Sequence, residues 1–410
     1  MGGPSILDCL NRRDDDERPE TEGLRSKALL IIKHAQHGTS STSLSETLFG
    51  LLDGVVKPLF SKDQHERLTS TGRKKVVQSQ LPTAATLFSH HLVVDQEEPL
   101  WKNAWISPLL SYIIQEHNSI DDLTRQRKVV DRHFYLLVPP ILRMIDDIDI
   151  LYKANGCRCL YELSEILVTT QSVILKRSGL TDVFVEALKN DFSYLPTLTP
   201  EEDSIMLYEQ LYPAFLGLVQ ARFQNLDTTT DQVESSQKQA YLTVLLRDQL
   251  LHSLKHLSTG SGMGSTMFPK LSTLLLVQLS NVVRDAGPPA SLHLQMFVPL
   301  LSNVMCDPFS VAAPQMLLAA VRGLETFADV CRPSLPSWWT DLLRPVVSCW
   351  LIVQDDEKEH LGGQIPQAIR EVQDRLRNIV GQLRGQIGRD FVNVERRIVH
   401  EEKSLQGLFS

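Results

Sequence analysis

Two histidines have a spacing that could bind a metal. His252 and His256 lie four residues apart, which would place both imidazoles on one face of a helix. A zinc-protease motif with this spacing carries a glutamate after its first histidine, but here the intervening residues are Ser253-Leu254-Lys255. We therefore interpret the pair as packed or solvated side chains and predict no metal there.

His-Glu dipeptides offer a second route to metal chemistry, because some enzymes built from helical repeats bind iron through them. His65-Glu66 and His400-Glu401 lie near opposite ends of the chain, outside any repeat pair that the sequence reveals. The glycines at 260, 262 and 264 imitate a phosphate-binding loop, yet no apolar strand precedes them and no Lys-Ser/Thr follows. The sequence predicts no catalytic residue, no cofactor and no metal, and a metal-dependent enzyme is the least favoured alternative.

Composition narrows the class of protein further. The 410 residues are 42% hydrophobic and 22% charged, which is typical of a soluble chain with a core. A net charge of −8 argues against nucleic acid as the main partner. No apolar run is long enough for a membrane span, and no secretory signal opens the chain. The six cysteines include no C-x-x-C, so we expect free thiols in a reducing compartment, the cytoplasm and also the nucleus.

Apolar residues recur at steps of three and four, not two. This spacing places them on one side of a helix, which must then pack against a neighbour. The clearest faces are Phe134/Leu137/Ile141/Met144, Cys157/Leu160/Leu163/Leu167, Phe268/Leu271/Leu275/Leu279/Val282 and Met316/Ala320/Leu324/Phe327/Cys331. The fold is therefore predicted to be all-α.

A proline motif recurs five times and suggests repeats. The prolines, each followed by two apolar residues, two mixed residues and another apolar residue, are Pro108, Pro140, Pro213, Pro299 and Pro345. Their spacings of 32, 73, 86 and 46 fit one, two, two and one units of about 40 residues. An offset of 160 aligns Pro139 with Pro299 and Asp147 with Asp307, each followed by a second helix. This is typical of an α-solenoid of HEAT-like repeats, with proline early in the first helix; an irregular helical bundle is the alternative.

Breaks in the pattern suggest boundaries. We predict a disordered leader over residues 1–26, helical repeats over 27–226 and a polar linker over 227–238. A second set of repeats is predicted over 239–359, followed by a long amphipathic helix and tail over 360–410.

Two surfaces are candidates for binding a partner. Trp338 and Trp339 are predicted to lie in the first turn of a helix, where adjacent side chains cannot face the same groove; they pack between repeats, or one anchors a partner. The terminal helix carries a long apolar stripe, and residues 365–398 hold seven arginines and four acidic residues. That helix caps the last repeat, docks onto a partner helix or, as the least favoured alternative, docks onto an acidic surface. The candidate surface comprises Trp338, Trp339, Arg370, Leu376, Ile379, Leu383 and Phe391.

One block is more specific than repeat physics requires. Its defining residues, in order, are Pro139-Pro140, Asp146-Asp147, Lys153, Gly156-Cys157, Ser178-Gly179-Leu180, Val183-Phe184, Ala187-Leu188, Leu195-Pro196, Leu198-Thr199-Pro200-Glu201-Glu202 and Tyr212-Pro213. This order resembles the Tel-interacting protein two family of HEAT-repeat subunits, over roughly residues 101–350. Locally, Thr199 is predicted to cap a helix that begins at Pro200, and Gly179 to end one in a left-handed conformation.

The resemblance implies a non-catalytic scaffold subunit of the TTT co-chaperone complex. Its partners would be the other two TTT subunits, phosphatidylinositol-3-kinase-related kinases of the TOR, ATM and ATR class, and the heat shock protein 90 machinery. The alternative is a generic HEAT-repeat adaptor, such as a transport receptor or a phosphatase scaffold.

Overall fold

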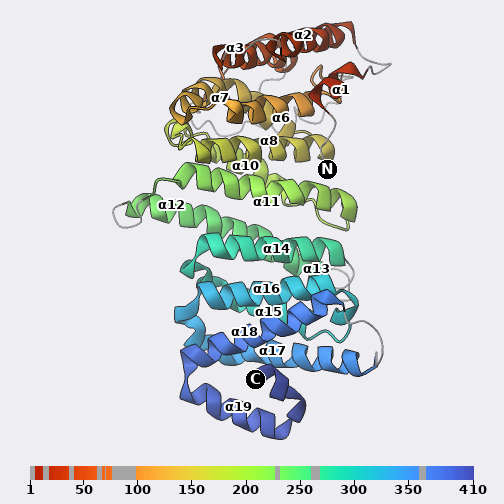
Figure 1. Ribbon diagram of the computed structural model, residues 1–410, viewed down its shortest axis with the longest axis vertical. Coiled ribbons are helices and arrows are strands. Elements are labelled where there is room, and N and C mark those ends of the chain that lie inside the picture. Colours follow the sequence, from red (N-terminus) through yellow and green to blue (C-terminus); the bar gives the residue numbers. More distant parts are fainter. Residues whose placement is uncertain are drawn as a thin grey trace, which may run out of the picture. The chain divides into compact units, whose positions relative to one another are not determined.

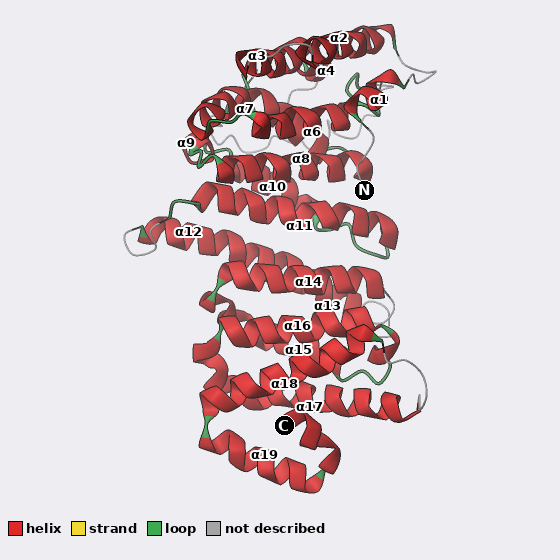
Figure 2. Cartoon of the chain, viewed as in Figure 1, coloured by secondary structure: helices red, strands yellow, loops and turns green. Residues whose placement is uncertain are grey.

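The chain folds almost entirely into helices. The structure, a computed structural model, describes residues 5–12, 18–36, 41–61, 67–69, 71–75, 98–226, 231–259, 268–359 and 366–410. Over these ranges no strand forms, and the one β-type contact is an isolated bridge between Leu68 and Lys74 (Figure 2). The predicted all-α fold is confirmed. None of the described helices combines the length and apolar character that crossing a membrane requires.

Two compact units make up the fold, and each is described by itself. Unit 1 comprises residues 1–191 and 206–226, and unit 2 comprises residues 192–205 and 227–410. Helix α11 (Glu201–Phe223) contributes to both units.

Unit 1 is a stack of helices in two layers. Its elements are α1 (Ile6–Asn11), α2 (Pro19–Gln36), α3 (Ser41–Leu51), η1 (Leu52–Val56), α4 (Lys57–Phe60), α6 (Ile106–Glu116), η2 (His117–Ser119), α7 (Leu123–Ile145), α8 (Ile150–Thr169), α9 (Ile174–Ser178) and α10 (Thr181–Asp191). Helices α3, α6 and α8 follow one another in one layer, and α4, α7 and α10 in the other (Figure 1). Each helix thus buries its apolar face against its neighbours, as a solenoid requires.

The pairing of α7 with α8 shows how the sequence produces this stack. Asp122 and Asp149 cap the two helices by accepting hydrogen bonds from the amides of Thr124 and Leu151, at 3.0 and 2.8 Å. The predicted apolar faces of both helices are buried. Gly156 permits the close approach, because a Cβ there would lie 2.8 Å from the amide nitrogen of Ile145.

The predicted leader is wrong in its described part. Residues 6–11 and 19–36 are helical, and Leu10 and Ala28 are fully buried. Arg25 explains the order, because its guanidinium donates to the carbonyls of Leu10 and Arg12 at 2.8 and 3.0 Å. The sequence showed acidic, apolar-poor residues here, but not this long-range cap.

Unit 2 repeats the two-layer arrangement. Its elements are α12 (Gln232–Thr243), η3 (Val244–Leu251), α13 (His252–Thr259), α14 (Pro269–Ala286), η4 (Pro288–His293), α15 (Leu294–Met305), η5 (Ser310–Ala312), α16 (Pro314–Val330), η6 (Arg332–Ser334), α17 (Leu335–Glu359), α18 (Gln367–Ile387), α19 (Arg389–Glu401), η7 (Lys403–Leu405) and α20 (Gln406–Phe409). Helices α14, α16 and α18 form one layer, while α13, α15 and α17 form the other (Figure 1).

The predicted linker over 227–238 is partly wrong, because α12 begins at Gln232. Residues 227–230 lie outside the described ranges.

The proline motif marks helices, but not always their first turn. Pro108 lies in the first turn of α6, whereas Pro140, Pro213 and Pro345 lie well inside α7, α11 and α17. The turn predicted after the motif is confirmed, because Asp147 and Asp307 each accept a hydrogen bond at 2.9 Å from the amide two residues on. Gly179 is left-handed as predicted, with φ of 63°. Helix α11 begins at Glu201 rather than at Pro200.

The predicted long terminal helix is two helices. Gly388, with φ of 71° and ψ of −126°, ends α18 and turns the chain into α19. This backbone region suits only glycine, so the apolar period runs on through the break while the helix does not.

Candidate partner-binding site

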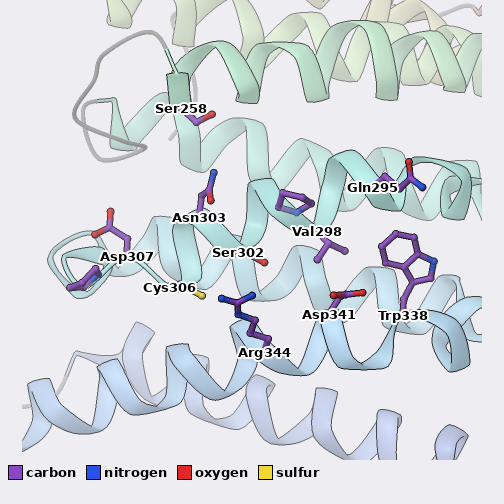
Figure 3. Close-up of a pocket in the computed structure, with 12 residues that line it drawn as sticks. Ser258, Gln295, Val298, Ser302, Asn303, Cys306, Asp307, Trp338, Asp341 and Arg344 are labelled. Carbon is purple, nitrogen blue, oxygen red and sulfur yellow. The ribbon is translucent and has the colours of Figure 1, made fainter.

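The two adjacent tryptophans point to different surroundings. Trp339 packs on Phe391 of α19, with ring centroids 5.8 Å apart. Trp338 instead lines a cleft between α15 and α17 and is half-buried (Figure 3). Both lie in the first turns of α17, as predicted, and the divergence of their side chains follows from the 100° step between neighbours on a helix.

The cleft has a volume of about 810 Å³. Helix α15 contributes Gln295, Val298 and Pro299, and α17 contributes Trp338, Asp341 and Arg344. The lining is completed by Ser258, Ser302, Asn303, Cys306, Asp307 and Pro308. A cleft of this size, with one aromatic side chain and a few polar groups, is of the kind that takes a ligand or a peptide segment.

Proline gives the cleft acceptors that an ordinary helix lacks. A proline inside a helix has no N–H, so the carbonyl four residues earlier loses its helical partner. Pro299 leaves the Gln295 carbonyl in this state, and Pro345 leaves that of Asp341. Gln295, Pro299 and Asp341 are all exposed, so these two carbonyls belong to residues that solvent or a ligand reaches.

The charges in the cleft are two carboxylates and one guanidinium. Within the part of the chain that the structure describes, no ion pair forms at Asp307, Asp341 or Arg344. The net formal charge of the three is −1, and the open carbonyls add negative potential. The cleft therefore favours a cationic or N–H-rich ligand.

The terminal apolar stripe faces inward, which corrects the idea that it docks outward. Leu376, Ile379 and Leu383 of α18 are fully buried between α16 and α17, and Phe391 of α19 is 1% exposed. These four candidate residues form part of the core of unit 2. Arg370 is exposed on α18. The helix pair thus caps the last repeat, which is the other interpretation that the sequence allowed.

Arginines beside this stripe are engaged by the chain itself. Arg375 forms ion pairs with Glu371 at 2.7 Å and with Glu325 of α16. Arg384 pairs with Glu395 at 2.9 Å and donates to the carbonyl of Phe409 at 2.6 Å. Their positive charge holds α16, α18, α19 and α20 together, so a basic sequence segment need not be a basic binding face.

The sequence did not predict the buried ion pair between Lys153 and Asp191. Lys153 Nζ lies 2.6 Å from Asp191 Oδ1, and both side chains are almost fully buried. Burial raises the pKa of Asp191 to about 6, against the opposing effect of Lys153. Lys153 also donates to the Ile145 carbonyl at 2.8 Å, so it ties α10 to the α7–α8 turn. Lys153 was visible only as a family residue, because the sequence does not show which acid it meets.

A buried histidine pair was also missed. His117 Nδ1 lies 2.8 Å from the carbonyl of Ile113, and its Nε2 lies 3.0 Å from His133 Nδ1. The carbonyl can only accept, so we assign the proton to His117 Nδ1 and the second hydrogen bond to donation by His133. Burial lowers the pKa of His133 to about 3, with His117 and Arg132 adding to the effect. Both rings are neutral parts of the core.

No metal site is assembled in the described residues, where no three His, Cys, Asp or Glu side chains gather suitably. His256 Nε2 lies 3.2 Å from the Pro196 carbonyl, and His400 lies near the end of α19. His65 and Glu66, like residues 260–264, lie outside the described ranges.

All six cysteines are free thiols, and Cys157, Cys159, Cys331 and Cys349 are buried. Burial raises the pKa of Cys159 to about 12.

Stacked helix pairs with an open cleft define a helical-repeat binding protein. Comparison with known families is more specific: the sequence model of the Tti2 family matches residues 10–312. The chain therefore belongs to the Tti2 family. The match begins well before residue 101, where the resemblance was expected to start, and it ends before residue 350, so α17 and its tryptophans lie beyond it. Comparison with curated proteins gave no match.

Membership of the family supports a role as a subunit of the TTT complex, with proteins as partners. The sequence named Trp338 as a candidate surface residue, and it named Pro299 and Asp307 only as markers of a repeat. It did not indicate Gln295, Asp341 or Arg344, because their meeting depends on how α15 packs beside α17.

Proposed function

We propose that the chain is a non-catalytic scaffold subunit of the TTT co-chaperone complex. In this role it supports maturation and stability of kinases of the TOR, ATM and ATR class together with heat shock protein 90. The observation that carries the proposal is the family match over residues 10–312. The stacked helices of each unit support it, because such stacks act by presenting long surfaces to partners.

The proposal has consequences for assembly and location. The chain contacts the other two TTT subunits directly and the kinases through the assembled complex. It works in the cytoplasm, and in the nucleus where kinases of the ATM and ATR class act. Neither nucleic acid nor membrane is a partner.

An affinity pull-down tests the assembly. The tagged full-length chain, expressed at its natural level, is purified from cell extract, and the bound proteins are identified by mass spectrometry. The expected result is recovery of the two other TTT subunits in near-stoichiometric amounts, with heat shock protein 90 co-chaperones. A chain that runs as a partnerless monomer in extract contradicts the proposal.

A depletion experiment tests the function. Removal of the chain from cells should lower TOR, ATM and ATR protein levels together while their messenger RNA levels stay constant. Re-expression of the full chain should restore the levels. Unchanged kinase levels after complete removal would exclude the proposed role in kinase stability.

A further inference from the structure

A hairpin in unit 1 contacts two helices, α7 and α10, and the described residues of unit 2 place no such hairpin on the corresponding helices, α15 and α17. The hairpin comprises residues 67–75, of which the structure describes all but residue 70. Its two arms pair through the Leu68–Lys74 bridge, and the Lys75 amide donates to the Arg67 carbonyl at 2.8 Å. Gly72, with φ of 73°, lies at its turn.

This hairpin contacts both α7 and α10. Gly72 lies directly against the Tyr135 carbonyl and near Pro139, so that a side chain at position 72 would collide with that oxygen. Arg73 lies over the Tyr135 ring, 5.4 Å from its centroid, and Lys74 pairs with Asp182 of α10 at 3.5 Å. Pro139 is what removes the helical partner of the Tyr135 carbonyl. A glycine turn with basic neighbours thus covers a carbonyl that proline has left open.

The cleft of unit 2 is built from the corresponding parts. The offset of 160 aligns Tyr135 and Pro139 of α7 with Gln295 and Pro299 of α15. Helix α17 packs beside α15 as α10 packs beside α7. Asp341 of α17 lies 159 residues after Asp182 of α10.

The corresponding residues of the two units differ in exposure and in ion pairing. Tyr135 and Pro139 are half-buried, whereas Gln295 and Pro299 are exposed. Asp147 is paired with Lys102 at 2.8 Å, whereas its counterpart Asp307 has no cationic partner among the described residues. The unit 2 cleft presents a carbonyl left open by proline, a carboxylate on the adjacent helix and a carboxylate at the turn. Figure 3 shows the two carboxylates, Asp341 and Asp307, and among the residues that the structure describes no basic segment lies against them.

We propose that the α15–α17 cleft binds a glycine-containing turn with basic flanks from a partner polypeptide. The glycine crosses the Gln295 carbonyl, one basic side chain reaches Asp341, and another reaches Asp307. Trp338 supplies the aromatic surface that Tyr135 supplies in unit 1. The hairpin of a second copy of this chain is not the occupant, because it is held by α7 and α10 of its own chain.

Arg344 sets the selectivity of the cleft. Its guanidinium is the one cationic group among the lining residues that the structure describes. It therefore disfavours a partner that would place a basic group next to Arg344. The two carboxylates outnumber it, and the net preference remains for a basic segment. Conversion of Arg344 to an acid should therefore strengthen binding of a basic turn.

A peptide-binding assay on the full-length chain tests the proposal. The probe is a fluorescent peptide with the sequence CRLTSTGRKKC, closed by a disulfide between its end cysteines to hold the turn. Binding is followed by fluorescence anisotropy at low and physiological salt. The double variant Asp307→Asn/Asp341→Asn should weaken binding about tenfold, because each exposed ion pair supplies a few-fold. Asp329→Asn/Asp355→Asn, with the same charge change outside the cleft, should bind like the natural chain.

Three further arms separate the site from nonspecific attraction. Replacement of the peptide glycine by alanine should weaken binding, because the added Cβ would meet the Gln295 carbonyl. Arg344→Glu should strengthen binding several-fold. A peptide in which the four basic residues become glutamate should not bind. Circular dichroism of each variant confirms folding.

The proposal is overturned if the natural chain gives no saturable signal, if both aspartate pairs act alike, or if the acidic peptide binds as well as the basic one. It adds a partner chemistry to the proposed scaffold function without depending on TTT assembly. Peptide binding by a chain that recovers no TTT subunits would sink the proposed function alone. Recovery of the subunits without peptide binding would sink this inference alone.

Discussion

At the scale of single residues, the buried polar pairs show why chemistry-bearing residue types need not do chemistry. His117 and His133 share a hydrogen bond inside unit 1, and His133 is fully buried. Its Nε2 has no hydrogen-bond partner in the described residues. A neutral imidazole tolerates this position, whereas a protonated one would be an uncompensated buried charge. The pair therefore makes stability depend on pH.

The His133 pair predicts a loss of stability in acid. The folded-state pKa of His133 is about 3, below the usual 6.5, so the unfolded chain takes up the proton first as the pH falls. Stability from this group is complete above about pH 6.5 and is lost progressively toward about pH 3. Between pH 7 and pH 5 the loss is about 2 kcal/mol.

Replacing His133 by asparagine tests this prediction. Asparagine can donate to His117 as Nδ1 does but cannot titrate, so His133→Asn should lower the pH 7-to-5 loss by about 2 kcal/mol. Urea unfolding at both pH values measures it, with His400→Asn as an exposed control. Equal pH dependence in His133→Asn and the natural chain would show that His133 does not carry the effect.

At the scale of elements, the sequence predicted helices well and their ends less well. Apolar spacing located α7, α8, α14 and α16 because the apolar residues at that spacing within each helix are buried. It overran the break at Gly388, because Phe391 is as buried as Leu383 on the other side of the turn. The α1–α2 segment was missed because its order depends on Arg25 reaching carbonyls of another helix. Long-range contacts of this kind leave no period in the sequence.

Two glycines, Gly381 inside α18 and Gly388 directly after its last residue, should respond to alanine with opposite signs. Gly388→Ala should destabilise by about 1 to 3 kcal/mol, because its backbone region is open only to glycine. Gly381→Ala should stabilise by about 0.5 to 1 kcal/mol, because Gly381 is exposed within the helix and a Cβ there meets nothing within 4 Å. Thermal unfolding of both variants measures the signs. A loss in both would mean that α18 does not continue straight through Gly381.

At the scale of the whole molecule, the contacts among helices divide the chain into two units, and the polar composition of a predicted linker does not. The chain divides near residue 227, but residues 192–205, which include the start of α11, belong to unit 2, while residues 206–226 belong to unit 1. The polar segment 227–238 was predicted to be a linker. Its described part, residues 231–238, lies largely in α12, because a helix in a stack needs only one apolar face. Of the candidate surface named from the sequence, Trp338 lines a cleft, whereas the apolar stripe of α18 is core.

Two compact units should respond separately to damage. Leu376 is fully buried in α18, so Leu376→Asp should destabilise unit 2 by about 4 kcal/mol or more. In a stack, each helix pair depends on its nearest neighbours, so the loss should decline along the chain. Hydrogen exchange read by mass spectrometry should show faster exchange in α16, α17 and α18, with unchanged rates in α7 and α8. Arg370→Asp, an exposed change on the same helix, should leave both regions unchanged. Faster exchange in α7 and α8 as well would mean that the two units unfold as one cooperative body.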